Sequence, residues 1–533
     1  MKMSVIQIKN LSFSYPGALQ PVFNNVTLNL DTSWRLGLVG RNGRGKTTFL
    51  RLLLGQLQGR GQIISAQKFD YFPAKINDTE QPALTVCRAI IAPFDAWEQQ
   101  MQALTATATP KAMEEYGDIE HAYATAGGYT INEAIEAEAG KLGVEGQALL
   151  RPFKTLSGGE QVKLMLAAIF LKKHHFLLID EPTDHLDTEG RTIVAKWLSG
   201  KSGFILVSHD RDFLDQAVDH ILSINRNDIE LQKGNYSSWH ANRTLQDNFE
   251  LAENEKLQKN INRLKVAAKQ TERWSDKVEK SKYGSMLKDD APAGLDRGYI
   301  GHQAAKMMKR SKSIERRQAK EIEEQQTLLK NIEQAEPLKF MALKAPKPTL
   351  LLAEDLTFGY GGPPILNNLN FAIKAGDRIA VTGQNGSGKT SLVKLVEGLY
   401  MPTGGRLQKP GQLIISTLPQ NTSFLQGDLQ EFVASQKIDP SLFLALLRKL
   451  NFERETFNQP MQRYSAGQKK KVCLAASLAK PAHLFVWDEP LNYIDILSRE
   501  QIEQAIESSQ PTMLFVEHDA AFVNNIATGY IQL

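Results

Sequence analysis

Gly40-Arg41-Asn42-Gly43-Arg44-Gly45-Lys46-Thr47 recurs later in the chain as Gly383-Gln384-Asn385-Gly386-Ser387-Gly388-Lys389-Thr390. Both stretches fit the pattern G-x-x-x-x-G-K-[ST], a glycine-rich loop whose backbone N–H groups surround the phosphates of a nucleotide. An apolar run at residues 36–39 precedes the first loop, and a helix is expected to start in residues 47–54. The sequence therefore predicts an α/β fold with two tandem P-loop nucleotide-binding domains.

Three further motifs follow each loop in the same order. They are a Ser-x-Gly signature at Ser157 and Ser465, a strand-like apolar run ending in Asp-Glu-Pro at Asp180 and Asp488, and a Val-x-His-Asp at His209 and His518. The signature serine lies 23 residues before the aspartate in both halves, and the histidine follows that aspartate by 29 residues in the first half and 30 in the second. A single loop would be a moderate signal, whereas two complete and ordered sets predict a duplicated ATPase.

Each motif supplies one part of phosphoryl chemistry. The loop lysines are expected to contact the β- and γ-phosphates, and the threonines after them to offer hydroxyls to Mg²⁺. The strand-ending aspartates would hold Mg²⁺ directly or through water. Glu181 and Glu489 are placed to polarise the attacking water, and His209 and His518 to sense the γ-phosphate.

The length of 533 residues is too great for one core. We predict a first nucleotide-binding domain at residues 1–240, a basic helical linker at 241–345 and a second nucleotide-binding domain at 346–533. The first domain has 35 more residues than the second between its loop lysine and its signature serine, which places a helical insertion at about residues 96–143. The insertion is either a longer helical subdomain or an added contact arm.

Composition excludes several classes of protein. A hydrophobic fraction of 42% and a charged fraction of 23% are ordinary for a globular protein. Cys87 and Cys473 have no metal-ligand spacing and are expected to be core thiols in a reducing, cytoplasmic compartment. The sequence starts directly with a strand-like run at residues 5–8, and no stretch of 18 apolar residues occurs. A pump built on this ATPase would need its pore on another chain.

The middle segment is the basic part of the chain. Residues 241–345 hold 22 lysines and arginines against 16 acidic residues, whereas the remainder has a net charge of −2. Residues 242–281 lack Pro and Gly, and Leu257, Ile261 and Leu264 follow a coiled-coil seam. With a second helical stretch at 302–335, an antiparallel hairpin about 60 Å long is expected, its tip at residues 284–301. The plainer alternative is a solvated helix face.

The signatures Leu156-Ser157-Gly158-Gly159-Glu160 and Tyr464-Ser465-Ala466-Gly467-Gln468 resemble those of ABC ATPases, and the resemblance covers both halves, nearly 430 residues. It implies that the two domains pair head to tail, each ATP lying between one P-loop and the other domain's signature. It also implies that Tyr15 and Tyr360 stack on adenine and that Gln420 is the Gln-loop residue. The implied ATP contacts are Tyr15, Gly40, Asn42, Gly43, Gly45, Lys46, Thr47, Thr48, Ser157, Gly158, Gly159, Tyr360, Gly383, Asn385, Gly386, Gly388, Lys389, Thr390, Ser391, Ser465 and Gly467, and the implied Mg²⁺ ligands are Thr47, Asp180, Thr390, Gln420 and Asp488.

Two departures from the family pattern fall in one composite site. Ala74 stands where the first domain should have its Gln-loop residue, and Ala466 stands where the signature should have glycine. By the head-to-tail arrangement both belong to the site built on Lys46. We therefore predict unequal sites, with the Lys46 site slower to hydrolyse ATP than the Lys389 site.

Tandem ATPase halves joined by a long charged helical linker resemble the ABC-F family. Glu253-Asn254-Glu255-Lys256, Met308-Lys309-Arg310-Ser311-Lys312 and Asp488-Glu489-Pro490-Leu491-Asn492-Tyr493-Ile494-Asp495 resemble its antibiotic-resistance branch, the Lsa- and Vga-like ribosome protection proteins. This implies a monomer that enters the tRNA exit site of the 70S ribosome, near 23S rRNA and the P-site tRNA. There it would dislodge peptidyl-transferase-centre antibiotics of the lincosamide, pleuromutilin or streptogramin A type.

The linker would make those contacts through its charges and its tip, since ribosomal RNA is a dense polyanion. The expected contact residues are Lys282, Tyr283, Met286, Leu287, Leu295, Arg297, Tyr299, Lys309, Arg310 and Lys312. Two alternatives remain open: a housekeeping ABC-F translation factor and, ranked lower, the ATPase subunit of a drug exporter.

Overall fold

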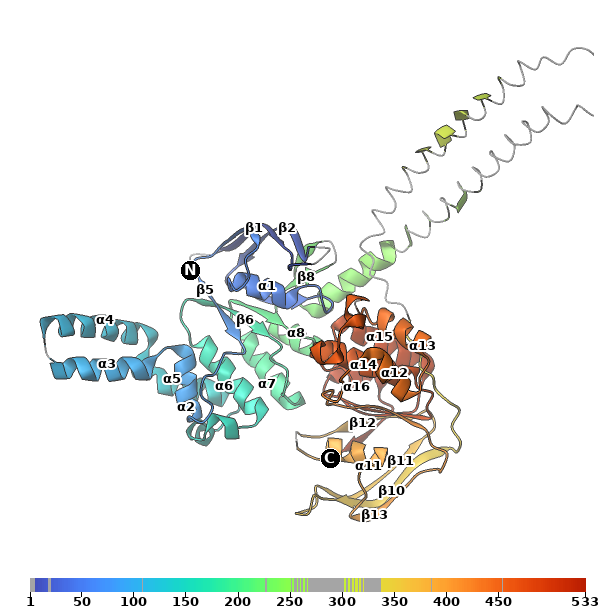
Figure 1. Ribbon diagram of the computed structural model, residues 1–533. Helices are drawn as coiled ribbons and strands as arrows, with labels where there is room; N and C mark the ends of the chain where they lie inside the picture. The colour runs from blue at the N-terminus through green and yellow to red at the C-terminus, as the bar shows by residue number, and fades with distance from the viewer. Residues whose placement is uncertain are drawn as a thin grey trace, which may run out of the picture. The chain divides into compact units, whose positions relative to one another are not determined.

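The computed structural model describes residues 5–17, 21–107, 109–225, 228–250, 337–384, 386–452 and 454–533, together with single positions between 252 and 320. The chain divides into two compact units, Met1–Trp239 with Ala335–Leu533, and His240–Gln334. The first unit holds both nucleotide-binding halves (Figure 1). Among the residues that the structure describes, no helix is long and apolar enough to cross a lipid bilayer.

The first half contains strands β1–β9 and helices α1–α8. In chain order these are β1 (Val5–Phe13), β2 (Phe23–Asp31), β3 (Arg35–Val39), α1 (Lys46–Leu53), β4 (Arg60–Ile64), β5 (Lys68–Phe72), α2 (Ala83–Ile91), α3 (Phe94–Thr107), α4 (Pro110–Ala126), α5 (Ile131–Lys141), α6 (Gly158–Phe170), β6 (His175–Asp180), α7 (Thr188–Ser199), β7 (Phe204–Val207), α8 (Arg211–Ala217), β8 (His220–Ile224) and β9 (Ile229–Lys233). A six-stranded sheet has the order β5-β6-β7-β3-β8-β9, with only β9 antiparallel to its neighbour, and a three-stranded antiparallel sheet has the order β2-β1-β4.

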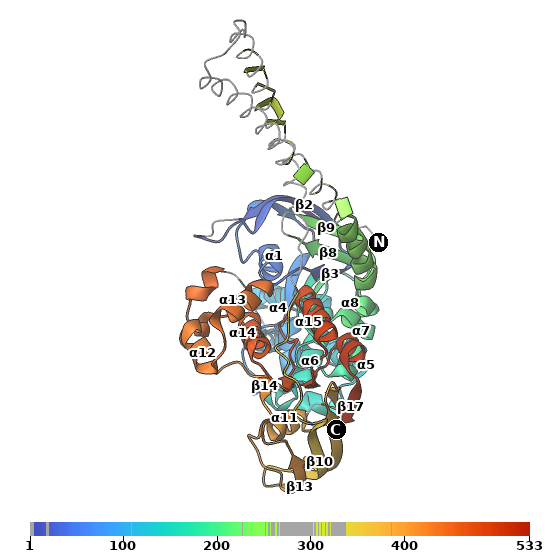
Figure 2. The ribbon, with the colours of Figure 1, turned by 90° about the vertical axis from the view of Figure 1, so that its right-hand side faces the viewer.

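The second half repeats this plan with a shorter helical part. Its elements are β10 (Thr349–Phe358), β11 (Leu366–Lys374), β12 (Arg378–Thr382), α11 (Lys389–Glu397), β13 (Gly404–Gln408), β14 (Ile415–Leu418), α12 (Leu429–Gln436), α13 (Pro440–Lys449), α14 (Ala466–Ala479), β15 (Leu484–Asp488), α15 (Ile496–Ser509), β16 (Met513–Val516), α16 (Ala520–Ile526) and β17 (Gly529–Gln532). The parallel sheet has the order β14-β15-β16-β12-β17, the antiparallel sheet the order β11-β10-β13, and helices α12, α13 and α14 lie together beside them (Figure 2).

The central strands are apolar along their whole length because both of their faces are covered. In β6, Phe176 and Leu178 join the core that α1 shares with the antiparallel sheet, while Leu177 and Ile179 join the core beneath α6, α7 and α8. Each of these side chains contributes about 1.5–3 kcal/mol by leaving water. In β15, Phe485 and Trp487 join one part of the second half's core, while Leu484 and Val486 join the other. Each parallel sheet is therefore packed on both faces, and this packing fixes the position of the loops at its carboxyl edge.

The predicted insertion at residues 96–143 holds α3, α4 and α5. Helices α3 and α4 pack side by side and project from the first half as a pair (Figure 1). Arg88 anchors the base of the pair, because its guanidinium donates to Asp95 at 2.9 Å and to Glu98 at 2.6 Å. Glu138 on α5 accepts hydrogen bonds from the Trp197 indole at 2.7 Å and from Lys201 at 2.8 Å, which ties the insertion to α7 and the segment after it.

Cys87 and Cys473 are free, buried thiols, as predicted. Burial raises the pKa of Cys87 to about 12 and that of Cys473 to about 11, so neither is a nucleophile at neutral pH.

In the other unit, the described positions between 252 and 266 and between 302 and 320 are helical and exposed, and Lys309, Arg310 and Lys312 are among them. Lys282, Tyr283, Met286, Leu287, Leu295, Arg297 and Tyr299 lie outside the described residues, as does Asn385 of the second P-loop.

Candidate ATP sites

Each P-loop joins the end of a parallel strand to the start of a helix, and glycines make the close approach possible. Gly45 has φ 93°, and a side chain there would begin only 2.5 Å from Val22. Gly388 has φ 101°, and a side chain would begin 2.7 Å from Ile365. Only glycine adopts these angles and fits these spaces without strain. The following lysines, Lys46 and Lys389, are buried and start α1 and α11.

The loop lysines fold back over their own loops. Lys46 donates from Nζ to the Gly40 carbonyl at 2.7 Å, and Lys389 donates to the Gly383 carbonyl at 2.8 Å. Burial lowers the pKa of both ammonium groups from their ordinary value. A cation held this way in a buried loop of backbone N–H groups fits a polyphosphate, whose charges would favour the protonated lysine.

The strand-ending aspartates lie directly behind the loops. In the first half, Asp180 Oδ2 lies 3.3 Å from the Thr47 hydroxyl. Asp488 Oδ1 is buried without a hydrogen-bond partner, and burial together with the neighbouring Glu489 raises the pKa of Asp488 to about 6. The described residues contain no group of three His, Cys, Asp or Glu side chains that could hold a metal by themselves. This donor set therefore suits Mg²⁺ that takes further ligands from phosphate and water.

The glutamates after these aspartates adopt the left-handed region. Glu181 and Glu489 both have φ 48°, which costs free energy for a side-chain-bearing residue and is frequent at functional sites. Glu181 Oε1 lies 3.4 Å from His209 Nε2, whereas Glu489 Oε1 lies 3.8 Å from His518 Nε2. Burial, followed by the Asp184 and Asp180 carboxylates, raises the pKa of Glu181 to about 8.

Both histidines are neutral at physiological pH. Burial, reinforced by Lys46, holds the pKa of His209 well below its ordinary value. Burial and the Arg191 guanidinium lower the pKa of His518 to about 4. Each neutral imidazole has one donor and one acceptor nitrogen, so one nitrogen can face the glutamate while the other faces a ligand.

The two signatures begin helices α6 and α14. Ser157 caps α6 in a reciprocal arrangement with Glu160, and Ser465 caps α14 in the same way with Gln468. Such caps fix the first helical turn and leave its backbone N–H groups facing outward, toward negative charge.

A cavity of about 410 Å³ lies between the first P-loop and the second signature. It is lined by Asn42, Gly43, Glu181, Thr183, Asp184, Arg191, His209, Asp210, Asn451, Phe452, Ser465, Ala466, Gly467, Gln468, Lys471, Asn492, Tyr493 and Arg499. Asn42 Nδ2 donates to the Tyr493 carbonyl across the two halves at 2.9 Å. The lining does not include Tyr15, Lys46, Thr47, Thr48 or Asp180, although the sequence predicts them at this site. Among these residues, the Tyr15 hydroxyl is 2.9 Å from Thr48 Oγ1, and the Thr47 hydroxyl is 3.3 Å from Asp180 Oδ2.

A second cavity, of about 920 Å³, lies between the second P-loop and the first signature. It is lined by Ser157, Gly158, Gly159, Glu160, Lys163, Asp184, His185, Leu186, Asp187, Arg191, Tyr360, Ile365, Gln384, Gly386, Gly388, Lys389, Thr390, Ser391, Gln420, Glu489, Asn492, Tyr493 and His518. Gly386 is part of an open cradle, because a side chain there would meet no atom within 4 Å. The structure thus groups most of the predicted residues of this site around one cavity.

Several residues that line the cavities were missed at the level of sequence. Asp184, Asn492 and Tyr493 line both cavities from the loops after the Asp-Glu-Pro motifs. Lys163 and Lys471 each lie six residues after a signature serine, and each lines one cavity. The equal spacing of six residues from the signature serine to the lysine in both halves could have identified these two lysines as site residues.

Comparison with known proteins agrees with this geometry. Residues 23–184 and 366–492 match the ABC transporter family. The putative ATP-binding protein YdiF of Bacillus subtilis is 27% identical, with 100% of this chain and 80% of YdiF covered. ABC transporter F family member 2 of Arabidopsis thaliana is 25% identical, with 99% of this chain and 76% of that protein covered. The probable ATP-binding protein YbiT of Escherichia coli O157:H7 is 26% identical, with 96% of this chain and 93% of YbiT covered.

Two solved structures have a similar fold. One is the archaeal ribosome recycling factor aABCE1 in complex with the ribosomal stalk protein aP1, with TM-score 0.55, 19% identity and coverage of 98% of this chain and 87% of that one. The other contains ribosome-bound archaeal Pelota and ABCE1, with TM-score 0.56, 20% identity and coverage of 98% and 76%. With two ATP-binding halves, two composite cavities and relatives named for the F family, this chain belongs to the ABC transporter family as an ATPase of the ABC-F type.

Proposed function

We propose that this ATPase acts on the ribosome in the cytoplasm. The observation that carries the proposal is the cluster of basic residues on the helical part of the middle unit. These residues are helical and exposed, and Lys306, Arg310 and Arg317 follow one another by four and seven residues, as expected on one face of a helix. The full set is Lys306, Lys309, Arg310, Lys312, Arg316, Arg317 and Lys320. Such a cluster suits the phosphates of folded RNA. The ribosomal partners of the two structurally similar proteins add support.

At each site we assign the roles that the motifs suggest. The P-loop N–H groups and the lysine bind the triphosphate, while Thr47 with Asp180, and Thr390 with Asp488 and Gln420, would hold Mg²⁺. Bound Mg²⁺ would neutralise charge on the phosphates. Glu181 and Glu489 orient the attacking water, His209 and His518 contact the γ-phosphate, and Tyr15 and Tyr360 stack on adenine. ATP binding would draw each P-loop onto the opposing signature, and hydrolysis would release it.

The finer proposal concerns the site of action. We propose that the protein enters the tRNA exit site as a monomer, with its linker toward 23S rRNA and the P-site tRNA. There it dislodges lincosamide, pleuromutilin or streptogramin A antibiotics from the peptidyl-transferase centre. The sequence Leu491-Asn492-Tyr493 after the second Asp-Glu-Pro supports this resistance role, because it resembles that branch of the ABC-F family. A housekeeping translation role without a drug is the alternative.

The first experiment is ribosome binding by the full chain carrying Glu181→Gln and Glu489→Gln. With ATP, this hydrolysis-deficient protein is expected to co-sediment with ribosomes from lysate, and without ATP it is not. A matched variant with Lys309, Arg310 and Lys312 changed to Gln should lose much of that binding while retaining ATP binding. Fractionation with membranes instead of ribosomes would overturn the proposal.

Drug susceptibility then separates the two ribosomal roles. Cells that express the wild-type protein should become less susceptible to at least one of the three antibiotic classes. Substitutions of Tyr283, Met286 or Leu295 should change that susceptibility without changing ribosome binding. Ribosome binding with unchanged susceptibility to all three classes would instead favour the housekeeping role.

A further inference from the structure

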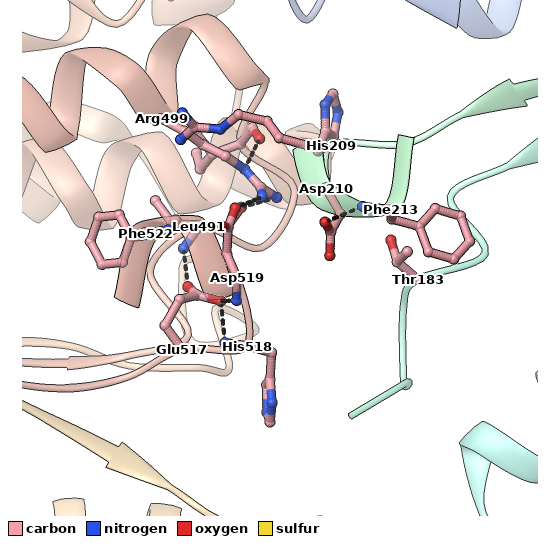
Figure 3. Close-up of polar contacts among 12 residues, drawn as sticks. Thr183, His209, Asp210, Phe213, Leu491, Arg499, Glu517, His518, Asp519 and Phe522 are labelled. Atoms are coloured by element: carbon pink, nitrogen blue, oxygen red, sulfur yellow. Dashed lines mark hydrogen bonds and ion pairs between the residues drawn. The ribbon is translucent and has the colours of Figure 1, made fainter. Parts of the chain in front are cut away.

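Glu517 is a buried carboxylate beside the second site that the sequence motifs leave without a role. It precedes His518 and is 5% exposed. Its Oε2 accepts the backbone N–H of Leu491 at 3.1 Å, and its Oε1 accepts the N–H of His518 at 2.7 Å and that of Asp519 at 3.4 Å (Figure 3). One side chain therefore joins the loop after Glu489 to the loop that carries His518.

The first half makes this connection with two hydroxyl groups. Ser208 occupies the position of Glu517, and Thr183 occupies that of Leu491. The two hydroxyl oxygens lie 3.4 Å apart, and Ser208 Oγ accepts the N–H of Asp210 at 3.1 Å. Thr183 and Asp210 lie in the corresponding loops of the first half (Figure 3).

The difference changes the surroundings of the glutamate that orients water. In the first half, the backbone N–H of His209 donates to Glu181 Oε2 at 3.2 Å. In the second half, Glu517 accepts the equivalent N–H of His518. Glu489 Oε2 instead accepts a hydrogen bond from Asn492 Nδ2 at 2.5 Å. Glu181 thus accepts a hydrogen bond from the backbone of the histidine loop. Glu489 instead accepts one from the side chain of Asn492, three residues further along its own loop.

Arg499 completes the frame that holds Glu517. Its Nη2 donates to the Leu491 carbonyl at 3.0 Å, and its Nη1 donates to Asp519 Oδ2 at 2.8 Å (Figure 3). The backbone of Leu491 is therefore held at its carbonyl by a guanidinium and at its N–H by a carboxylate. Such charge-assisted hydrogen bonds are stronger than neutral ones and restrict the position of the loop.

From these contacts we propose that Glu517 is a positioning residue for ATP hydrolysis at the Lys389 site. By accepting the N–H of His518, Glu517 removes a competing donor from Glu489 and leaves that carboxylate to Asn492 and the attacking water. By accepting the N–H of Leu491, it fixes the loop that carries Asn492. The inference rests on the ATPase activity alone and is independent of the ribosomal proposal.

The test exchanges the second half's pair for the first half's pair in the full chain. Leu491→Thr with Glu517→Ser rebuilds the hydroxyl pair and should fold with a Tm near that of the wild type. We expect its kcat for ATP to fall about tenfold, with KM within about twofold, because the orientation of water and not ATP binding is lost. Glu517→Gln keeps the shape and one acceptor oxygen and should give a smaller loss.

Two outcomes would overturn the proposal. One is a folded double variant whose kcat equals that of the wild type. The other is a fall in kcat of the variants only in proportion to their folded fraction, measured by circular dichroism, which would mean that Glu517 serves stability alone. Nucleotide-dependent ribosome binding by the variant with Glu181→Gln and Glu489→Gln is measured separately, so failure of this inference leaves the ribosomal proposal unaffected.

Discussion

At the residue scale, the two halves differ in what touches the aspartate behind each P-loop. In the first half the Tyr71 hydroxyl donates to Asp180 Oδ2 at 2.9 Å, the oxygen that also faces Thr47. In the second half Thr417 occupies the corresponding place on its strand, and Asp488 Oδ1 has no hydrogen-bond partner. The Tyr71 hydrogen bond therefore uses an oxygen of Asp180, a carboxylate that we assign to Mg²⁺. Together with Ala74 and Ala466, this contact supports unequal ATP hydrolysis at the two sites.

Substitution of Tyr71 by Phe tests this contact. A hydrogen bond to a charged group contributes about 1.5–3 kcal/mol, and without it Asp180 has more negative charge available for Mg²⁺. In a protein that also carries Glu489→Gln, Tyr71→Phe should lower the Mg²⁺ concentration for half-maximal ATP hydrolysis several-fold. A rise in that concentration would mean instead that the phenol helps Asp180 to bind the metal.

Single substitutions of the two glutamates test the inequality directly. Glu489→Gln should lower steady-state ATP turnover at least about 100-fold, the usual scale for losing a group that orients water. Glu181→Gln should leave most of the turnover, because the Lys46 site contributes less. Equal losses, measured by phosphate release at saturating ATP, would contradict unequal sites.

At the scale of elements, the strands and P-loop helices were readily predicted. The run at residues 36–39 and the runs at 176–179 and 484–487 that end in Asp-Glu-Pro all lie in parallel strands. Strands covered on both faces must be apolar throughout, which is why they could be recognised. Contacts such as Tyr71 to Asp180, or Glu517 to Leu491, could not be predicted in this way. They depend on which side chains face each other across neighbouring loops, and neither periodicity nor motif spacing carries that information.

The anchoring of the helical insertion gives a prediction about pH. Burial of Glu138 opposes ionisation, but Lys201, Lys141 and Trp197 outweigh it and lower the pKa of this carboxyl to about 2. Because the folded-state pKa lies below the unfolded one, the stabilisation is full above about pH 4.5 and is lost as the pH falls toward 2. Glu138→Gln should therefore cost about 1–2 kcal/mol at pH 7 after allowance for solvent screening.

Urea unfolding at pH 7, 4 and 3 measures this effect. The difference in unfolding free energy between the wild type and Glu138→Gln should narrow at each step toward acid. Glu133→Gln, on the same helix α5, is the control, because Glu133 forms no ion pair among the residues that the structure describes. Its unfolding free energy should differ little from that of the wild type at each pH. A difference that stays constant with pH would mean that the ion pairs of Glu138 do not anchor the insertion.

At the scale of the whole molecule, the two halves contact each other through side chains that have no equivalent at the matching positions of the repeat. Arg211 on α8 forms an ion pair with Glu503 on α15, and the Tyr236 hydroxyl donates to Glu500 at 3.1 Å. Counted from the aspartates that cap α7 and α15, the counterparts of Glu503 and Glu500 are Ala195 and Thr192. The chain therefore carries charged contacts between its halves that the duplication alone does not supply.

Glu503→Gln tests this link. Without the Glu503 carboxylate, the mostly buried guanidinium of Arg211 loses its ion-pair partner. This should lower the free energy of unfolding by about 1–3 kcal/mol. We expect a lower Tm and a higher KM for ATP, because both cavities need residues from both halves. Thr192→Gln, at the counterpart of Glu500, is the matched control. A Glu503→Gln protein with wild-type Tm and KM would exclude a role for this ion pair in coupling the halves.

The composite cavities have a consequence for how such a protein changes over generations. In an assembly of two identical chains, one mutation in the gene alters both sites at once. Here the second signature lines only the first cavity, and the first signature lines only the second, so a substitution at a signature residue such as Ala466 reaches a single cavity. Natural selection can therefore act on one catalytic centre while the other keeps its inherited sequence.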